Sequence, residues 1–357
     1  MAIGLLPRPR ELLRCHAAEP LLQETHLQHP RDRSQLHPAG QRSALVETED
    51  DDQDTARHGA TLTGGNAFFA LSRSVPLTVP GFRPIFPAIY MNEQVKQRVV
   101  RGLRSAGLIG VVDSLLYWQE RLRRVAENRA FVREHTAYAV PPYPILFDAL
   151  AHCSLRGYLQ SGLADGRFIA ATIRRYLKGD LVVCEWGCGP ARILRQLGAL
   201  DGGLRQLIGA DYNTETIEWC RRAIPGVRFV VNGLRPPLDI PAGSVDVLYA
   251  ISVFTHLSAE TQREWAVEVR RVLRPGGLFL FTVQGERCVS KLLPDERARF
   301  DQGVPVVREK VREGKKHFVS YESADFVRRV LLEGFTEVEP IEWPGFHQDT
   351  WAARVPP

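Results

Sequence analysis

The stretch Leu181-Val-Val-Cys-Glu185-Trp-Gly187-Cys-Gly189-Pro-Ala-Arg192-Ile-Leu decides how this chain folds. It reads as an apolar strand that ends in an acid, followed by a tight glycine pair and then a helix. Gly187 and Gly189 allow a sharp turn where a side chain would collide with a ligand. A helix behind such a turn offers unpaired N–H groups to an anion. The stretch therefore predicts the first strand–turn–helix unit of a Rossmann-like fold.

Two residues of this stretch argue against a dinucleotide as the ligand. Arg192 stands where the pattern G-x-G-x-x-G has its third glycine. Glu185 lies two residues before the first glycine, where its charge would repel a pyrophosphate. A cofactor with an ammonium group and no phosphate fits better, which favours S-adenosylmethionine (SAM) and disfavours a nicotinamide-dependent dehydrogenase.

Beyond this stretch, strand and helix patterns alternate, which is typical of a parallel α/β sheet. The last two strands are separated only by residues 342–348, too few for a crossover helix, so they must be antiparallel. Strands are expected at 181–186, 206–211, 227–232, 245–251, 278–282, 336–341 and 349–354. Helices are expected at about 191–199, 214–223, 259–273 and 322–333, and a turn at Pro275-Gly276-Gly277.

The chain divides into three parts on its composition. Residues 1–75 have few periodic apolar positions and an acidic run, so we expect a disordered tail. Five irregularly spaced histidines in this tail favour a solvated segment over a metal site, and translation could start downstream, near Met91. Residues 76–178 are expected to form a helical cap, and residues 179–357 the cofactor-binding domain.

Within the expected cap, apolar residues recur at helical spacing. Residues 92–134 predict helices broken at Gly107 and Gly110, and residues 144–178 predict two helices split near Ser161-Gly162.

Bulk composition excludes several classes of protein. The charge of +5 comes from 46 basic and 41 acidic residues spread along the chain, so no nucleic-acid partner is expected. The sequence contains no run of about 20 apolar residues, so no membrane insertion is expected. The cysteines show no paired C-x-x-C spacing, which favours reduced thiols and a cytoplasmic location. The oligomeric state stays open.

Four motifs in order resemble those of the class I SAM-dependent methyltransferases. They are Glu185-x-Gly187-Cys188-Gly189, Asp211 at the end of the second strand, Asn232 at the end of the third, and Leu273-Arg-Pro-Gly-Gly277. The resemblance covers residues 181 to about 355. It implies a seven-stranded, mostly parallel Rossmann-like sheet with an antiparallel final strand, and SAM as cofactor.

The resemblance also implies roles for particular residues. Glu185 would face the methionyl amino group of SAM or order the glycine loop, and Asp211 would bind the ribose hydroxyls or cap the next helix. Asn232 would contact the adenine in place of a common acid, since an amide can accept and donate. The implied cofactor-binding set is Glu185, Gly187, Cys188, Gly189, Asp211, Tyr212, Asn232, Gly233, Ile251 and Ser252.

A closer resemblance is to bacterial methyltransferases of cell-surface glycan and natural-product gene clusters. Four pieces carry it: Tyr143–Asp148, Tyr158–Gly162, Ala250–Leu257 and Phe346–Asp349. It implies a small-molecule or glycan acceptor, methylated at oxygen. An aminopropyl-type transferase on the same fold and a SAM-binding partner without turnover remain alternatives.

Three residues are candidate bases for the acceptor. His256 follows the fourth strand and either takes a proton or fixes its loop by bonding to the backbone. His347 and Asp349 precede the last strand, where they face the substrate or hold a hairpin turn. The long connection between residues 285 and 317 predicts a lid, whose Arg308–Lys316 run either binds an acidic acceptor or forms a solvated helix face.

Overall fold

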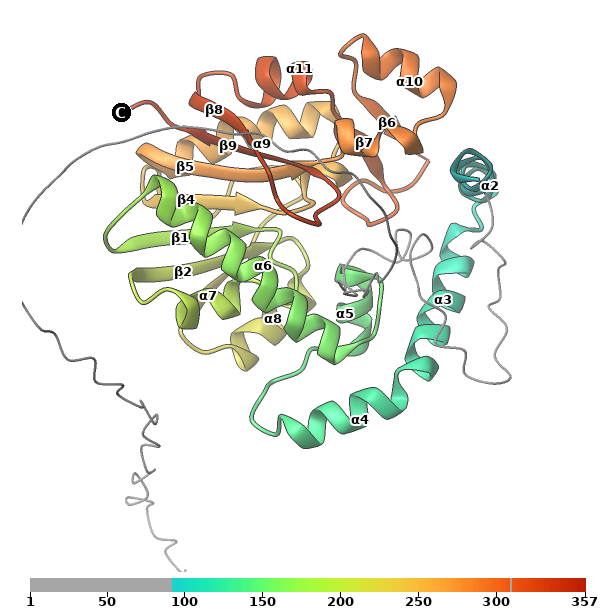
Figure 1. Ribbon diagram of the computed structural model, residues 1–357, viewed down its shortest axis with the longest axis horizontal. Helices are drawn as coiled ribbons and strands as arrows, with labels where there is room; N and C mark the ends of the chain where they lie inside the picture. The colour runs from blue at the N-terminus through green and yellow to red at the C-terminus, as the bar shows by residue number, and fades with distance from the viewer. Residues whose placement is uncertain (1–91, 309) are drawn as a thin grey trace, which may run out of the picture. The chain divides into compact units, whose positions relative to one another are not determined.

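The computed structural model describes residues 92–308 and 310–357, and its centre is a seven-stranded sheet (Figure 1). The strand order is β3-β2-β1-β4-β5-β9-β8; β1 to β5 are parallel, and β9 is antiparallel to both β5 and β8. The expected Rossmann-like sheet with an antiparallel final strand is therefore confirmed. The strands are β1 Leu181–Trp186, β2 Leu204–Asp211, β3 Val227–Val231, β4 Val245–Ala250, β5 Leu273–Val283, β8 Thr336–Ile341 and β9 Asp349–Arg354.

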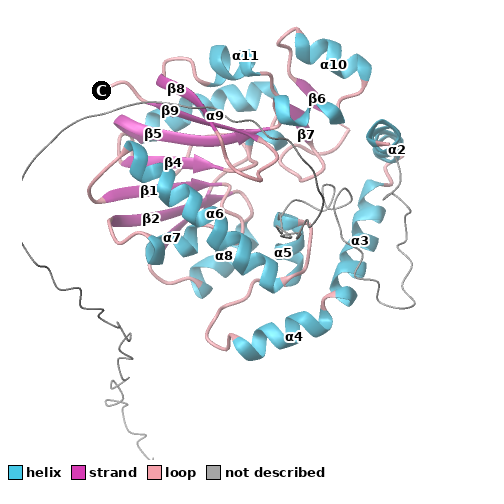
Figure 2. Cartoon of the chain, viewed as in Figure 1, coloured by secondary structure: helices cyan, strands magenta, loops and turns pink. Residues whose placement is uncertain are grey.

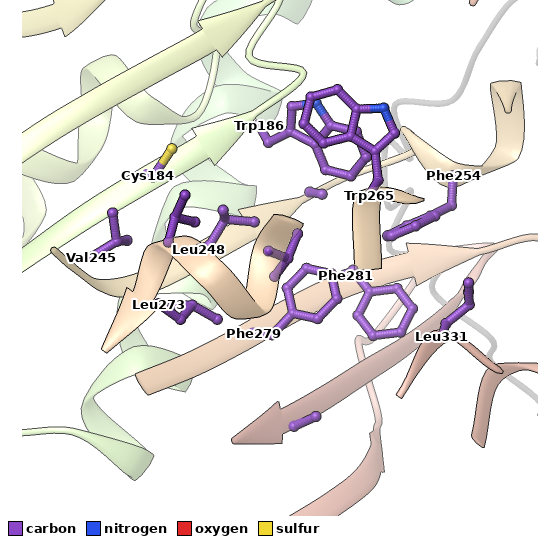
Figure 3. Close-up of a cluster of buried hydrophobic side chains, with 14 of the residues drawn as sticks. Cys184, Trp186, Val245, Leu248, Phe254, Trp265, Leu273, Phe279, Phe281 and Leu331 are labelled. Atoms are coloured by element: carbon purple, nitrogen blue, oxygen red, sulfur yellow. The ribbon is translucent and has the colours of Figure 1, made fainter. Parts of the chain in front are cut away.

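Both faces of the sheet are covered by helices, so its central strands are apolar on each side. All six residues of β1 are buried. Alternate residues of this strand enter two different clusters, because successive side chains point to opposite faces. Val182, Cys184 and Trp186 pack with α9 (Ala259–Val272), whereas Val183 packs with α6 (Leu155–Tyr176). Figure 3 shows the first cluster, and Figure 2 shows the helices around the strands.

The helices of the sheet region follow the predicted ones with shifts at their ends. The structure has α7 at Leu194–Leu200, α8 at Thr214–Ala223 and α9 at Ala259–Val272. α7 starts three residues later than predicted, because residues 190–193 form turns. The last predicted helix is a short α11, Ala324–Phe326, followed by a π-helical turn over Val327–Leu331.

The predicted turn at residues 275–277 lies inside β5 as a bulge. Val245 pairs with Leu273 and Val247 with Leu278, so the residues between 273 and 278 leave the register. Gly276 has a φ of +71°, which a glycine adopts without strain.

Between residue 92 and the sheet, the structure describes five helices: α2 Glu93–Ser105, α3 Ile109–Arg123, α4 Val125–Glu134, α5 Tyr143–Leu150 and α6 Leu155–Tyr176. The predicted break at Gly107 is confirmed, since this residue has a φ of +69° between α2 and α3. The predicted break at Gly110 is wrong, because this residue lies inside α3. The sequence also missed the break at Arg124.

The predicted split near Ser161-Gly162 is also wrong. α6 runs unbroken through these residues, and the actual gap lies between α5 and α6, at residues 151–154. Gly162 is needed for close packing and does not interrupt the helix, because a Cβ there would overlap the carbonyl oxygen of Arg192. The missing side chain lets α6 approach the loop that follows β1.

The connection after β5 holds elements that the sequence did not predict. It contains a 3₁₀ helix η3 at Glu286–Lys291, α10 at Pro294–Asp301, and a small hairpin of β6, Val306–Arg308, with β7, Val319–Tyr321. The predicted solvated helix over Arg308–Lys316 is therefore wrong. Arg308 is in a strand, and its guanidinium pairs with Glu296 at 2.7 Å.

The first part of the chain lies outside the described residues. The expected tail at 1–75, the start of the cap up to residue 91 and the histidines of the tail therefore stay predictions. Within the described parts of the chain, no helix combines the length and apolar character that crossing a bilayer requires.

The contact at Gly162 makes a stability prediction. Gly162→Ala is expected to lower the free energy of unfolding by about 1–3 kcal/mol, because the new methyl group meets backbone that cannot swing away. Chemical denaturation measures the change. Gly102→Ala is the control: nothing lies within 4 Å of its Cβ position in α2, so alanine should stabilise by about 0.5–1 kcal/mol. Equal effects of the two substitutions would contradict the assigned role of Gly162.

Candidate cofactor and acceptor cavity

A cavity of about 240 Å³ opens at the carboxyl ends of the first four strands. This is the edge where open parallel sheets bind ligands. All ten residues of the predicted cofactor set line it, and so do His256 and His347, whereas Asp349 is not among its lining residues. Residues to which the sequence analysis gave no role include Asp148, Ser161, Val253 and Trp265, and Lys316 of the Arg308–Lys316 run also lines the cavity.

The turn after β1 is built on left-handed backbone. Gly187 has a φ of +74° and Gly189 a φ of +50°, and a Cβ on Gly187 would overlap a methyl group of Val253. Ala191 also has a positive φ, +54°, which costs a non-glycine residue on the order of 1 kcal/mol. The Cys188 thiol is buried, and burial raises its pKa well above the ordinary value, so it packs rather than reacts.

The Glu185 carboxyl occupies the N-terminus of α7, where a phosphate would bind in a dinucleotide site. Its Oε2 atom accepts hydrogen bonds from the Leu194 amide of α7 at 3.2 Å and from the Tyr249 hydroxyl at 3.0 Å. Burial raises the pKa of Glu185 to about 8, although the Tyr249 hydroxyl and the charge of Arg192 act in the opposite direction. The free side chain is therefore mostly protonated at neutral pH, and a nearby cation would favour its ionised form.

Asp211 connects β2 to two loops at once. One carboxylate oxygen accepts from the Gly189 amide at 2.9 Å and the other from the Asn213 amide at 2.8 Å. The alternative role as cap of α8 is wrong, since Asn213 caps that helix through its bond from the Thr216 amide. Burial raises the pKa of Asp211, although its backbone hydrogen bonds from Asn213, Gly189 and Tyr212 act in the opposite direction.

Asn232 holds an unsatisfied acceptor beside the cavity. Its Nδ2 atom donates to the carbonyl oxygen of Gly233 at 2.7 Å, which leaves Oδ1 buried with no hydrogen-bond partner among the described residues. A buried acceptor without a partner is costly, so a ligand amino group at this point would satisfy it. Trp265 braces the same loop by donating from Nε1 to the Leu234 carbonyl at 2.8 Å.

Ser252 follows β4 in a strained conformation, with a φ of +60°. Two hydrogen bonds hold it there, and a third joins its two partners. Its amide donates to Thr282 at 2.8 Å, and its hydroxyl donates to the Gln348 side chain at 3.0 Å. The Thr282 hydroxyl donates to the same Gln348 oxygen at 2.6 Å. The sequence analysis missed both partners because they lie far along the chain, Thr282 on β5 and Gln348 just before β9.

His256 combines a fixed tautomer with an open nitrogen. It lies in a 3₁₀ turn, Phe254–His256, and its Nδ1 atom is 2.8 Å from the Phe318 carbonyl oxygen. A carbonyl only accepts, so Nδ1 carries the proton and Nε2 is left as an acceptor. Burial lowers the pKa of His256, which keeps the ring neutral, while the charge of Asp148 partly opposes the shift. The predicted bond from this histidine to the backbone is thus present.

The other two candidate bases differ from His256. His347 lines the cavity, but burial and the charge of Lys291 lower its pKa to about 4, so it is a weak base. Asp349 binds the start of η3, where its two oxygens accept from the amides of Glu286 at 2.7 Å and Arg287 at 3.1 Å. Asp349 is therefore not among the residues that line the cavity, and these two bonds hold η3 rather than the expected hairpin turn.

A loop from the connection after β5 borders the cavity; we call residues 310–318 the covering loop. The Gly314 amide donates to the His256 carbonyl at 3.0 Å, and the Tyr212 hydroxyl donates to the Gly314 carbonyl at 2.8 Å. Lys316 lines the cavity and forms an ion pair with Asp113 of α3 at 2.9 Å. The segment expected to be a lid thus borders the cavity through Gly314 and Lys316, and Lys316 already has a counter-charge.

Three comparisons relate this chain to known proteins. Residues 184–281 match the family model described as "Methyltransferase domain". A protein of Mycolicibacterium smegmatis named "Probable S-adenosylmethionine-dependent methyltransferase" is 40% identical over 101 residues, which are 28% of this chain and 36% of that protein. This chain thus spans little more than a third of the length of the curated relative.

Solved methyltransferase structures match parts of this chain at low identity. A SAM-dependent methyltransferase of Methanosarcina mazei is 19% identical, covers 52% of this chain and 97% of its own, and has a TM-score of 0.39. The 1,6-didemethyltoxoflavin-N1-methyltransferase of Burkholderia thailandensis is 18% identical, covers 57% and 88%, and has a TM-score of 0.38.

The buried carboxyl of Glu185 predicts a pH dependence of stability. Its pKa is raised from 4.5 to about 8, so the stability it contributes is complete below pH 4.5 and is lost as the pH rises through 8. Between pH 5 and pH 7 this one group should lower the free energy of unfolding by about 2–3 kcal/mol. Glu185→Gln should remove that part of the slope in denaturation measured at several pH values.

The control is Asp180→Asn, which changes an exposed carboxyl just before the same strand and should leave the slope as it is. An unchanged slope in Glu185→Gln would show that this carboxyl ionises normally in the folded protein.

Proposed function

We propose, on the premise that the chain carries a class I SAM-dependent methyltransferase domain, that it transfers the methyl group of SAM to an oxygen of a small-molecule or glycan acceptor. One observation carries the proposal. The glycine loop presents the Glu185 carboxyl, bonded to the first amide of α7, where a dinucleotide site would present free helix amides. This arrangement favours a ligand with a cationic group over one with a pyrophosphate.

The residues around the cavity fit the parts of SAM. Glu185 would hold the amino group, Asp211 the ribose hydroxyls, and Asn232 the adenine amino group through its unsatisfied Oδ1 atom. When bound, SAM supplies an electrophilic methyl group on a positively charged sulfur. The chain's own task is then to position an acceptor and to take up its proton.

His256 is the base that the geometry supports best. Its Nδ1–H bond to Phe318 sets the ring orientation, and its lowered pKa leaves Nε2 unprotonated at neutral pH. His347, with a pKa of about 4, would hold a proton poorly. We therefore assign the acceptor proton to Nε2 of His256.

The charges near the cavity support an uncharged acceptor. Two cations line the cavity: Lys316 is paired with Asp113, and Arg192 with Asp165. Asp148 lines the cavity and makes no hydrogen bond or ion pair with the rest of the described chain. An acidic or phosphorylated acceptor would meet compensated cations and a lone carboxylate, which disfavours it.

Cofactor binding tests the proposal first. Isothermal titration should detect SAM binding and no NAD binding, with a proton released at pH 7 because the ligand's cation lowers the pKa of Glu185 from about 8. Titrations in phosphate and in Tris separate that proton by its buffer heat. Asp211→Asn should weaken SAM binding at least tenfold, and Asp239→Asn, an exposed acid outside the cavity, should not. Absent heat with SAM would contradict the proposal.

Substitution of His256 tests the assigned base. His256→Asn keeps a donor for Phe318 but lacks Nε2, so turnover with radiolabelled SAM and a screened sugar or polyketide acceptor should fall about 10²–10⁴-fold. The SAM dissociation constant should stay the same.

The pH profile of the rate separates this role from a structural one. The wild-type rate should fall on the acid side, with its midpoint below pH 6.5 because burial lowers the pKa of His256. That limb should vanish in His256→Asn and persist in His347→Gln. If the acid limb persists in His256→Asn, another group takes up the acceptor's proton. If the wild type binds SAM without turnover, the protein is a SAM-binding partner protein.

A further inference from the structure

Helix α3 exposes a row of large apolar side chains. Val111 is 58% exposed, Leu115 45%, Trp118 61% and Leu122 63%. Their spacing of four, three and four residues places them on one face of the helix. A surface helix of a soluble domain normally turns its polar face to water, and large apolar patches commonly mark an interaction site. This outer face of α3 therefore has the character of an interaction surface.

The same face carries no free carboxylate. The two acids of α3 are engaged elsewhere: Asp113 pairs with Lys316, and Glu120 lies 3.5 Å from both Arg123 and Arg124. The remaining exposed positions of α3 are Gly110, Ser114 and Arg123. The outer face of α3 is thus apolar with a single positive charge beside it.

The neighbouring helices add uncompensated positive charge. Arg98 of α2 and both Arg129 and Arg133 of α4 are exposed and form no ion pair within the described residues. The exposed acid of this region, Glu134, is neutralised by Arg156 at 2.6 Å. An apolar stripe with tryptophan and leucine, accompanied by arginines and few free acids, is the composition of a membrane-surface helix.

We propose that the outer face of α3 docks on an anionic phospholipid surface. A bilayer interface takes up tryptophan and leucine side chains, and its head groups match the unpaired arginines. A second copy of the chain fits less well, because a two-fold contact brings the same patch from both copies together and so juxtaposes their arginines. The proposal is independent of methyl transfer.

The docking helix also contacts the covering loop. Asp113 projects from α3 to the Lys316 ammonium at 2.9 Å, and the same ammonium lies 4.0 Å from the ring of Phe147. One side of α3 thus borders the loop at the cavity, while the other presents the apolar face. A bilayer-bound α3 would bring the cavity near acceptors held at the membrane.

Vesicle sedimentation with the full chain tests the docking. At 0.1 M salt the protein should pellet with vesicles of phosphatidylcholine and phosphatidylglycerol in a 70:30 ratio, and at least tenfold less with phosphatidylcholine alone. The triple variant Leu115→Ser, Trp118→Ser, Leu122→Ser should lose at least tenfold in the bound fraction. Arg98→Gln combined with Arg129→Gln and Arg133→Gln should lose binding to the anionic vesicles as well.

The control is Val267→Ser on α9, a valine 62% exposed and outside this region, which should bind like the wild type. Circular dichroism and the melting temperature must match the wild type in every variant, as expected for exposed positions. Equal binding by wild type and triple variant overturns the proposal. A wild-type dimer that the triple variant converts to a monomer, without vesicle binding, also overturns it and assigns the face to a second copy.

Discussion

The hydrogen bond from the Gly189 amide to the Asp211 carboxylate is the constraint on which this site depends. It fastens the turn after β1 to the end of β2, and the amides of Gly187 and Cys188 add bonds of 2.7 and 3.0 Å to the carbonyl of Ala210. The second oxygen of Asp211 holds the start of α8 through Asn213. One buried carboxylate therefore sets the positions of two loops that border the cavity.

This constraint explains why the glycine turn is so closely packed. The turn has little space to move, because it is packed on two sides. Val253, in the loop after β4, lies against Gly187, and Gly162 of α6 lies against the backbone of Arg192. A shape fixed by contacts on both sides costs little reorganisation when a ligand arrives. The cost appears instead as backbone strain at Ala191 and Ser252, both in the left-handed region. Strain of this kind is common where a binding loop must keep one shape.

The sequence predicts the features that depend on residues close together in the chain. The strands 336–341 and 349–354 were predicted to the residue, since their short connection dictates an antiparallel pair. The ten predicted cofactor residues meet at one cavity because strand ends determine where a ligand edge lies.

The errors concern residues whose role depends on distant partners. In the sequence, Gly162 indicates a helix break. In the structure, the backbone of Arg192, thirty positions later, occupies the space that a side chain at Gly162 would need. Asp349 follows a predicted cavity loop, yet it turns to the amides of η3, more than sixty residues earlier. No local pattern contains such information, and the pairing of Lys316 with Asp113 across two hundred residues is equally hidden.

The distribution of charge connects the inner and outer surfaces of this protein. Inside, Glu185 and Asp211 are held in low-dielectric surroundings that raise both pKa values, and this stored cost is relieved when a cation arrives. Outside, α3 gives one of its two acids, Asp113, to the covering loop, while its opposite, exposed face is apolar. If that carboxylate were instead on the exposed face, it would both oppose an anionic surface and free Lys316 toward the cavity. The Lys316–Asp113 ion pair thus compensates the cavity's lysine on one side of α3, and the nearby arginines compensate Glu120, the helix's other acid.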